Sequence, residues 1–423
     1  MNPTFKIAAA AMMVAGAFAS QAYAAGFQLS EQSAIQMGRA MAGAGVVGDD
    51  LSAVHYNPAG MTLLPGTRMQ ATGTWVAVNL DYEGDARADG SRATENGRLK
   101  GQLIPAGFIT HQLTDNVWTG LGLTVPYGMG TEYNNDWEGK DRGTDSMILT
   151  FDINPNIAWK VNEKFSVGAG VSLQYAKAKL GLGMDVPGTL INPAYPATPL
   201  PVHAVVKGDS WAWGWNVGMM FQPVDTVRIG LSYRSSIDHD AEGHTDATVA
   251  GTALPRSDMK VSLKTPDTVT LSATWEATEA LRLSGTARWS KWSNFDTLNV
   301  SNADYARTAM ANVQVENNWD DTWFFSVGAD YKIDSQWTVR GGVAYDQGPV
   351  ENQYRMAVIP DTDRVWFSLG TSYNCTNNLT FDFGATYIKG VGDTDLYNSR
   401  HQHIGEYKSL DSYIFSVQMQ YLF

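Results

Sequence analysis

The chain has 423 residues, of which 44% are hydrophobic, and carries 41 glycines, 14 tryptophans and a formal charge of -13. A nucleic-acid surface needs clustered Lys and Arg, so this acidic balance argues against a nucleic-acid partner. The length permits two or three soluble domains. However, no linker or sharp change of composition divides the chain after its N-terminal segment. We therefore expect one domain preceded by a short segment.

Residues 1–24 have the pattern of a cleaved secretory signal peptide. Lys6 supplies the positive charge, residues 7–18 form the apolar region, and Ala22-Tyr23-Ala24 provides a cleavage site. The apolar run is too short for a membrane helix, and no longer apolar run follows it. The single cysteine, Cys375, lies in a turn and predicts no disulfide framework. The sequence therefore predicts an exported protein without membrane helices.

The stretch 25–66 is rich in small residues and partly helical in pattern, unlike the rest of the chain. Ser30 is a plausible N-cap for a helix that ends at Gly43. Asn57 can cap a second helical turn with Pro58 at its first position. These signals predict a compact helical insert that is too short to form a domain of its own.

From Arg68 onward, apolar residues alternate with small or polar residues, as in the run Thr268 to Glu276. This alternation predicts β-strands with one apolar face. Many runs are about 12 to 18 residues long, against about 5–6 for an average soluble strand. A tilted transmembrane strand needs about 9–11. Fourteen candidate strands result: 68–83, 99–113, 116–127, 144–160, 163–182, 203–222, 225–242, 259–277, 280–295, 318–333, 336–347, 362–375, 378–391 and 410–423.

An even number of such strands predicts an all-β fold, a closed antiparallel transmembrane barrel in which every backbone group is satisfied. Short turns alternate with long connections, which we expect to face outward: 84–98, 128–143, 183–202, 243–258, 296–317, 348–361 and 392–409. Aromatic residues near strand ends suggest interfacial girdles: Trp75, Trp118, Trp159, Trp275, Trp289, Trp323, Tyr331 and Trp337. The last strand ends in Phe423, which resembles the C-terminal signature of bacterial outer-membrane barrels.

Charged strand residues should point into the lumen, because Arg on the lipid face costs about 2–4 kcal/mol at the midplane. The candidates are Arg228, Arg234, Arg282, Arg288, Arg340 and Arg364. One interpretation is a cationic track that attracts a carboxylate. The alternative, which we favour, is that they pair with lumen acids or with Asp49 and Asp50, since buried charges are commonly paired.

The connection 180–202 is unusually apolar for an exterior loop. An exposed apolar patch usually marks a binding surface; the alternative is a loop that folds back over the barrel mouth. The candidate groove residues are Leu180, Leu182, Met184, Val186, Leu190 and Ile191.

The third candidate strand carries Val125-Pro126-Tyr127-Gly128. Proline cannot donate to a strand ladder and is confined to edges, bulges and strand ends. These residues either end the strand or kink it and leave a gap in the wall.

No motif predicts catalysis, a metal or a cofactor. Gly43 to Gly48 matches G-x-G-x-x-G but follows a helix-like run, not a strand. The histidines of the outer loops lack acids or cysteines at ligand spacing, and no nucleophile arrangement stands out. We therefore expect a protein that is not an enzyme.

The N-terminal stretch is also similar to a known family. Ala25 to Ser30, Gly38 to Gly48 and Asp49 to Met61, with Ile359 to Gly370 and Trp289 to Phe295, resemble the FadL family of outer-membrane transporters for long-chain fatty acids and other hydrophobic compounds. The resemblance covers essentially the whole chain after residue 24.

The resemblance implies a fourteen-stranded barrel, residues 67–423, closed by a hatch, residues 25–66. It implies passive uptake from an external groove to a lumen pocket, with hatch movement and lateral exit through a kinked third strand. By position, it makes Phe27 the N-terminal pocket residue. Residues Asn57, Pro58 and Ala59 match the hatch motif, and Val125, Pro126, Tyr127 and Gly128 match the kink.

Other functions stay open at this point. Some members of the family carry monoaromatic hydrocarbons instead. A general porin needs neither a plug nor an apolar exterior loop, and an outer-membrane lipase would need a Ser-His pair at one rim. The expected partners are a long-chain fatty acid or similar hydrophobic ligand, and outer-membrane lipid and lipopolysaccharide around a monomer.

Overall fold

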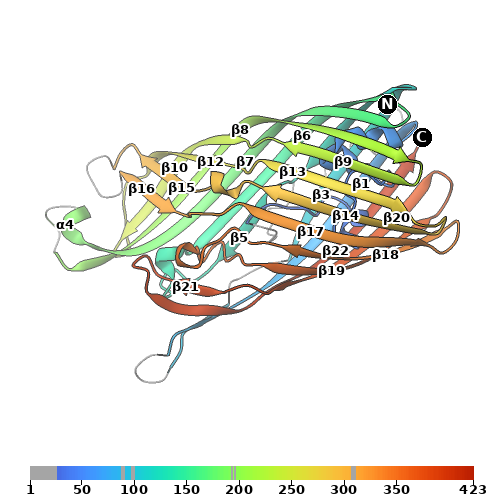
Figure 1. The fold of residues 1–423 in the computed structure, drawn as a ribbon. Coiled ribbons are helices and arrows are strands. Elements are labelled where there is room, and N and C mark those ends of the chain that lie inside the picture. Colours follow the sequence, from blue (N-terminus) through green and yellow to red (C-terminus); the bar gives the residue numbers. More distant parts are fainter. Residues whose placement is uncertain (1–25, 87–90, 97–100, 192–193, 195–196, 306–310) are drawn as a thin grey trace.

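The structure is a computed structural model that describes residues 26–86, 91–96, 101–191, 194, 197–305 and 311–423. The predicted signal peptide, residues 1–24, lies outside the described residues. The described chain forms a closed antiparallel barrel (Figure 1). Three short strands lie in the outer connections: β2 (Thr94–Asn96), β11 (Thr252–Ala253) and β21 (Asp395–Tyr397).

Fourteen wall strands, five of them in two pieces, make up the barrel. They are β1 (Thr67–Gly84), β3 (Gln102–Thr114), β4 and β5 (Val117–Thr124, Gly128–Glu132), β6 (Asp145–Asn162), β7 (Phe165–Pro187), β8 (Pro199–Val224), β9 and β10 (Val227–Arg234, Asp238–Val249), β12 and β13 (Ser257–Lys264, Thr268–Glu276), β14 and β15 (Leu281–Ser290, Thr297–Asn302), β16 and β17 (Asn312–Glu316, Thr322–Lys332), β18 (Trp337–Asp346), β19 (Arg364–Asn374), β20 (Leu379–Gly390) and β22 (His403–Leu422).

The first and last strands close the barrel. β1 pairs with β22 from Arg68 opposite Leu422 to Gly84 opposite Gly405, and with β3 on its other side. A closed sheet leaves no edge with unpaired backbone groups inside a bilayer. Within the described ranges, no helix is long and apolar enough to cross a membrane. The prediction of a fourteen-stranded antiparallel barrel is confirmed.

One predicted interfacial residue points the other way. Trp118 is 3% exposed, and its Nε1 donates to the carbonyl of Leu64 at 3.0 Å, inside the barrel. In β4 the even-numbered residues face the lumen, opposite Ala158 of β6, which is also buried. The assignment of Trp118 to a girdle was therefore wrong. Trp289 is partly exposed, and the other predicted girdle residues are exposed: Trp75, Trp159, Trp275, Trp323, Tyr331 and Trp337.

The outer connections contain more strand than expected. β7 runs to Pro187, β8 begins at Pro199 and β10 reaches Val249, so the predicted irregular connections 183–202 and 243–258 are partly wrong. Figure 1 shows β10, β15 and β16 at the same end of the barrel as the short helix α4 (Gly188–Ile191). The remaining short helices are η3 (Lys140–Arg142), η4 (Trp292–Asn294) and η5 (Asn352–Tyr354).

The hatch lies inside the lumen. It contains α2 (Ala34–Gly38), α3 (Ala53–Tyr56) and η2 (Pro58–Leu63). The first contacts β19 and β20, and the last contacts β6, β7 and β8 across the barrel. Two parts can be distinguished: an extended arm, residues 26–32, and a compact base, residues 33–66.

The two helix predictions had different outcomes. Asn57 caps η2 as expected, its side chain accepting from the amide of Ala59 at 3.1 Å. The first helix is shorter than predicted, beginning after Ser33 and ending at Gly38. Its continuation is interrupted because Ala40 and Met41 have positive φ angles of 53° and 65°, an unfavourable conformation for residues with a side chain.

Candidate functional site

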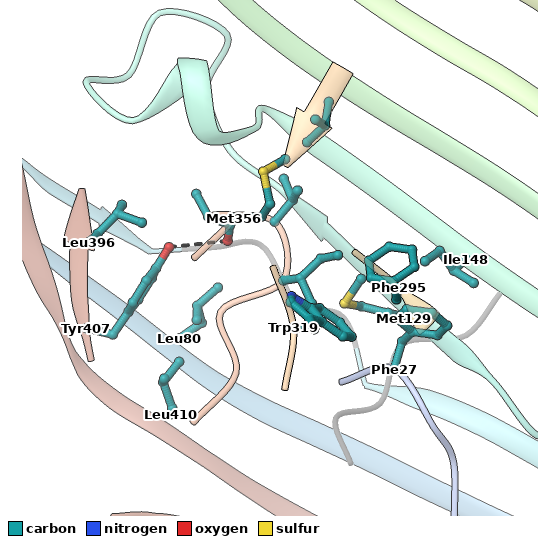
Figure 2. Close-up of a cluster of buried hydrophobic side chains, with 14 of the residues drawn as sticks. Phe27, Leu80, Met129, Ile148, Phe295, Trp319, Met356, Leu396, Tyr407 and Leu410 are labelled. Carbon is teal, nitrogen blue, oxygen red and sulfur yellow. Dashed lines mark hydrogen bonds between the residues drawn. The ribbon is translucent and has the colours of Figure 1, made fainter. Parts of the chain in front are cut away.

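Phe27 lies in a buried aromatic cluster inside the barrel, beside Phe295 and Trp319 (Figure 2). Its ring centroid is 4.8 Å from that of Trp292, 5.2 Å from that of Phe295 and 5.8 Å from those of Tyr127 and Trp319. Aromatic pairs at such distances contribute about 0.5–1.5 kcal/mol each beyond their area burial. The cluster therefore fixes the arm at its first residues.

The third wall strand is interrupted at the predicted kink. β4 ends with Thr124 opposite Asp152 of β6, and β5 resumes with Gly128 opposite Leu149. This strand advances four residues while β6 advances three, which is a β-bulge. Among the described residues, β5 pairs with β6 and has no pairing with β3, whose preceding residues 97–100 lie outside the described part of the chain.

The arm binds directly to this interruption. The amide of Leu29 donates to the carbonyl of Pro126 at 2.8 Å, and the amide of Gly128 donates to the carbonyl of Phe27 at 2.9 Å. Two such bonds form an isolated antiparallel bridge between the arm and the wall. The structure thus brings together two sets of predicted site residues, the N-terminal pocket residue and the kink, which are about a hundred positions apart.

The start of the arm needs a glycine. The amide of Gly26 donates to Asp361 Oδ2 at 2.7 Å, and the residue has a φ of +64°. A Cβ added at this position would lie 2.7 Å from the ring of Trp319 and 2.9 Å from that of Trp292. The close approach to the aromatic cluster therefore excludes a side chain here.

Ion pairs tie the base of the hatch to the opposite wall. Arg39 is fully buried and lies 2.6 Å from Asp49 of the hatch and 3.4 Å from Asp330 of β17. Asp330 also pairs with Arg340 at 3.0 Å, and Asp49 with Arg282 at 3.3 Å. Breaking a buried pair by removing one partner costs about 3–5 kcal/mol. The base is thus held more firmly than an ordinary loop.

The six predicted lumen arginines all lie inside the barrel. Five are in ion pairs, as the favoured alternative predicted: Arg228 with Glu276 (2.9 Å), Arg234 with Asp152 (3.5 Å), Arg282 with Glu276 (2.9 Å), Arg340 with Asp330 (3.0 Å) and Arg364 with Asp361 (2.7 Å).

Arg288 differs from the other five. Within the described part of the chain it has no ion pair. Its Nη1 donates to Ser30 Oγ of the arm at 3.0 Å, and its guanidinium lies 4.8 Å from the centre of the Phe324 ring. This side chain is 8% exposed, and its Nε has no hydrogen-bond partner among the described residues. It is the best candidate for an anion contact in the lumen.

Glu31 of the arm is a buried acid without a hydrogen-bond partner for either carboxylate oxygen among the described residues. Burial raises the pKa of its carboxyl to about 7, and nearby Asp346 acts in the same direction. The nearby backbone amide of Glu31 and the cations Arg364 and Arg288 lower the pKa, but they do not cancel this shift. The arm therefore carries a group that titrates near neutral pH.

An apolar cavity of about 270 Å³ lies in the outer part of the barrel. Four predicted groove residues, Leu180, Leu182, Met184 and Val186, line it from β7. They belong to a strand and not to an exposed loop, so that part of the prediction was wrong. The side chains of the other two, Leu190 and Ile191, lie outside the described residues.

A second apolar cavity, about 60 Å³, has lining residues in common with the outer cavity and with the aromatic cluster. The two cavities share Leu180, Val206 and Val300 on their walls. The smaller one also reaches Phe295, which contacts Phe27. Apolar side chains thus follow one another from the outer end of the barrel to the tip of the arm.

Comparison with known proteins agrees with this geometry. The model of the outer membrane protein transport protein family (OMPP1/FadL/TodX) matches residues 15–423. This chain belongs to that family. Outer membrane protein P1 of Haemophilus influenzae is 30% identical over 418 residues, covering 90% of this chain and 89% of the relative. The long-chain fatty acid transport protein of Escherichia coli K12 is 27% identical over 417 residues, 90% of this chain and 91% of that one.

Solved structures have the same fold. A FadL homologue from Pseudomonas aeruginosa superposes with a TM-score of 0.83 at 25% identity, covering 94% of this chain and 99% of that one. The toluene transporter TodX of Pseudomonas putida gives a TM-score of 0.71 at 18% identity, covering 88% and 94%. This chain is accordingly an outer-membrane transporter of hydrophobic compounds.

In this FadL-family barrel, the hatch motif, Asn57 to Ala59, connects the base of the hatch to the barrel wall. Asn57 Nδ2 donates to the carbonyl of Met219 in β8 at 3.1 Å, and Pro58 and Ala59 are buried. A Cβ at Gly168 of β7 would lie 2.7 Å from the amide nitrogen of Ala59. Motif and wall are therefore in direct contact.

Several residues at the site were missed from the sequence. Val202, Ala204 and Val206 line the cavities from β8, yet they fall in or beside a predicted loop. A signal for them exists: in β7 the apolar positions are odd up to Tyr175 and even from Leu180 onward. This change of parity marks where the outer face stops meeting lipid and the inner face becomes apolar. No pattern in the sequence indicated the buried ion pairs of Arg39.

Proposed function

We propose that this FadL-family transporter takes up long-chain fatty acids passively. The ligand enters the outer cavity, moves along the apolar residues to the aromatic cluster, displaces the arm, and leaves sideways through the interruption in the third wall strand. The observation that carries the proposal is the pairing of the arm with that interruption, since one movement then frees both the pocket and the exit.

The order of the apolar residues supports the first half of this route. Leu180 and Val300 belong to both cavities, and Phe295 connects the inner cavity to Phe27. An acyl chain gains about 0.8 kcal/mol for each CH₂ transferred from water to such surroundings. Lateral exit into lipid avoids returning the same methylene groups to water.

The ion pairs of the base support lateral over periplasmic exit. Arg39, Asp49 and Asp330 hold the base across the lumen at the end where the chain's short turns lie. The arm is held by two buried hydrogen bonds to charged side chains, from Arg288 to Ser30 Oγ and from the amide of Gly26 to Asp361, and not by a buried ion-pair network. The arm is therefore the part that moves at lower cost.

Arg288 favours a fatty acid over a monoaromatic hydrocarbon. A guanidinium without an ion pair, next to the arm, becomes available to a carboxylate when Ser30 moves away. A neutral hydrocarbon has no charged group that could pair with this guanidinium. The relatives named as fatty acid transporters and as toluene transporters leave both substrates as candidates, so the residue decides our preference.

The test is uptake by cells that lack their own transporter and express this chain. Labelled oleate should enter with the wild-type protein, and Arg288→Met should lower the rate for oleate while leaving toluene uptake unchanged. An equal loss of oleate and toluene uptake would show that Arg288 acts on folding alone and does not bind a carboxylate. This outcome would favour the hydrocarbon channel. Uptake of small sugars as fast as oleate would replace the proposal with a general porin.

A further inference from the structure

We propose that the side-chain amide of Gln32 is the seal of the gap in the barrel wall. This role deepens the lateral exit proposed above and rests on it for its transport consequence. Gln32 is the last residue of the arm and is fully buried. Its side chain reaches the wall at Val125, the first residue of the interruption.

The side-chain amide of Gln32 forms hydrogen bonds with both the carbonyl and the N–H of Val125. Its Nε2 donates to the carbonyl of Val125 at 2.8 Å and to the carbonyl of Leu29 at 3.2 Å. Its Oε1 accepts from the amide of Val125 at 3.4 Å. A side-chain amide carries the same donor and acceptor as a peptide group, so it can replace a residue of a neighbouring strand.

The register identifies which residue it replaces. The amide of Gln112 donates to the carbonyl of Gly66 at 3.0 Å, so even-numbered residues of β3 bond toward β1 and odd-numbered ones face β4. The recorded pairing of β3 with β4 ends at Gly107 opposite Leu123. Two residues further along each strand, Val125 would stand opposite residue 105.

Residue 105 is a proline. Pro105 has no N–H and cannot donate to the carbonyl of Val125, and Pro126 directly follows on the other side of the gap. Pro105 therefore interrupts the ladder between β3 and the third wall strand at this pair. The donor that Pro105 lacks is supplied by Gln32, which belongs to the arm and not to the wall.

Closure of the gap therefore depends on the docked position of the arm. When the arm leaves, Val125 loses both bonds, and the gap between β3 and β5 has no other hydrogen-bonded neighbour among the described residues. A permanent wall strand could not be removed in this way. The geometry assigns Gln32 the role of a positioning residue that holds the gap closed in the resting state.

The experiment measures amide hydrogen exchange at Val125 in the full-length barrel, with Gln32→Ala, Gln32→Glu and the control Gln28→Ala. Gln28 belongs to the same arm, but its Oε1 has no hydrogen-bond partner among the described residues. We expect exchange at Val125 to rise about tenfold in Gln32→Ala, since its amide loses its acceptor. Gln32→Glu keeps an acceptor but not the donor and should show a smaller rise. Gln28→Ala should match the wild type.

A second variant distinguishes sealing from simple support. Pro105→Val gives β3 the missing donor, so Gln32→Ala/Pro105→Val should return Val125 exchange to the slow wild-type value. The same double variant should take up oleate more slowly than Gln32→Ala, because the wall is now closed permanently. Barrel assembly is checked for each variant by heat-modifiable gel mobility.

Two results overturn the proposal: unchanged exchange at Val125 in Gln32→Ala, or no rescue by Pro105→Val. The exchange measurement needs no substrate. It therefore decides the seal even if oleate proves not to be carried. If exchange behaves as expected while the double variant transports at the rate of Gln32→Ala, the seal stands and lateral exit is rejected.

Discussion

The carbonyl of Phe27 accepts a hydrogen bond from the amide of Gly128 at 2.9 Å, so the residue at the centre of the aromatic cluster is also bonded to the wall at its interruption. Pocket and gap are consequently closed by the same few residues. A ligand that replaces the ring of Phe27 would weaken the wall contact as well.

Locking the arm should stop transport. Gln28 and Tyr127 form a non-hydrogen-bonded antiparallel pair, with Cα atoms typically about 4.5 Å apart, which suits a disulfide. In a Cys375→Ser background, oxidised Gln28→Cys/Tyr127→Cys should lose oleate uptake, and a reducing agent should restore it. Each single cysteine variant should be insensitive to reduction. Full uptake by the oxidised double variant would contradict arm movement.

Removing the aromatic ring of Phe27 should loosen the arm. Phe→Ala in a core costs about 3–5 kcal/mol, which here weakens docking of the arm more than the barrel itself. Amide exchange over residues 26–33 should accelerate in Phe27→Ala. Phe415→Ala, at a lipid-facing position that is 53% exposed, is the matched control and should leave exchange of the arm unchanged. Equal exchange in both variants would count against the cluster as the anchor.

Removing Arg39 should destabilise the base. Arg39→Leu leaves Asp49 and Asp330 without their buried partner and should cost about 3–5 kcal/mol in the free energy of unfolding. Arg256→Leu, which breaks an exposed pair with Asp246, should cost about 0–1 kcal/mol. Urea unfolding of both variants in detergent gives the comparison. Similar losses would show that the base is not held by its ion pairs.

A charge in the outer cavity should impair ligand entry. Leu182→Asp places a carboxylate among apolar side chains and should lower oleate binding and uptake. Lys177→Asp lies on the same strand, is exposed and serves as the control for charge alone. We expect only the first variant to raise the oleate concentration needed for half-maximal uptake. A larger effect of Lys177→Asp would place the entry route elsewhere.

Glu31 should make stability depend on pH. Because burial raises the pKa of the folded Glu31 carboxyl to about 7, above its ordinary value of 4.5, the folded protein binds more protons than the unfolded chain between these pH values. This contribution to stability is complete below about pH 4.5 and is lost as the pH rises through 7. Glu31→Gln should flatten the profile, whereas Glu163→Gln, in an exposed turn, should not. The urea midpoint between pH 4.5 and 8 measures the effect.

The barrel could be predicted from the sequence because its signals are local and repeated. Alternation with a period of two, as in Thr268 to Glu276, identifies a strand with one apolar face wherever the rest of the chain lies. Asn57 and Pro58 likewise indicate a capped turn from their own chemistry. The parity change between Tyr175 and Leu180 was equally present in the sequence, but it becomes informative only when both faces of the wall are known.

Local patterns in the chain are therefore enough to predict the barrel, its strand number, the hatch as a separate segment and the inward orientation of the strand arginines. Which of these arginines are paired, where the first hatch helix ends, and how Phe27 and Gln32 bond to the interruption at Val125 depend on contacts formed in the folded protein. The contacts of Phe27 and Gln32 with the third wall strand join residues about a hundred positions apart, and a side-chain amide carries no local signal for such a partner. The proline at 105 has a local meaning as a missing donor, yet its consequence depends on the strand that would have received the bond.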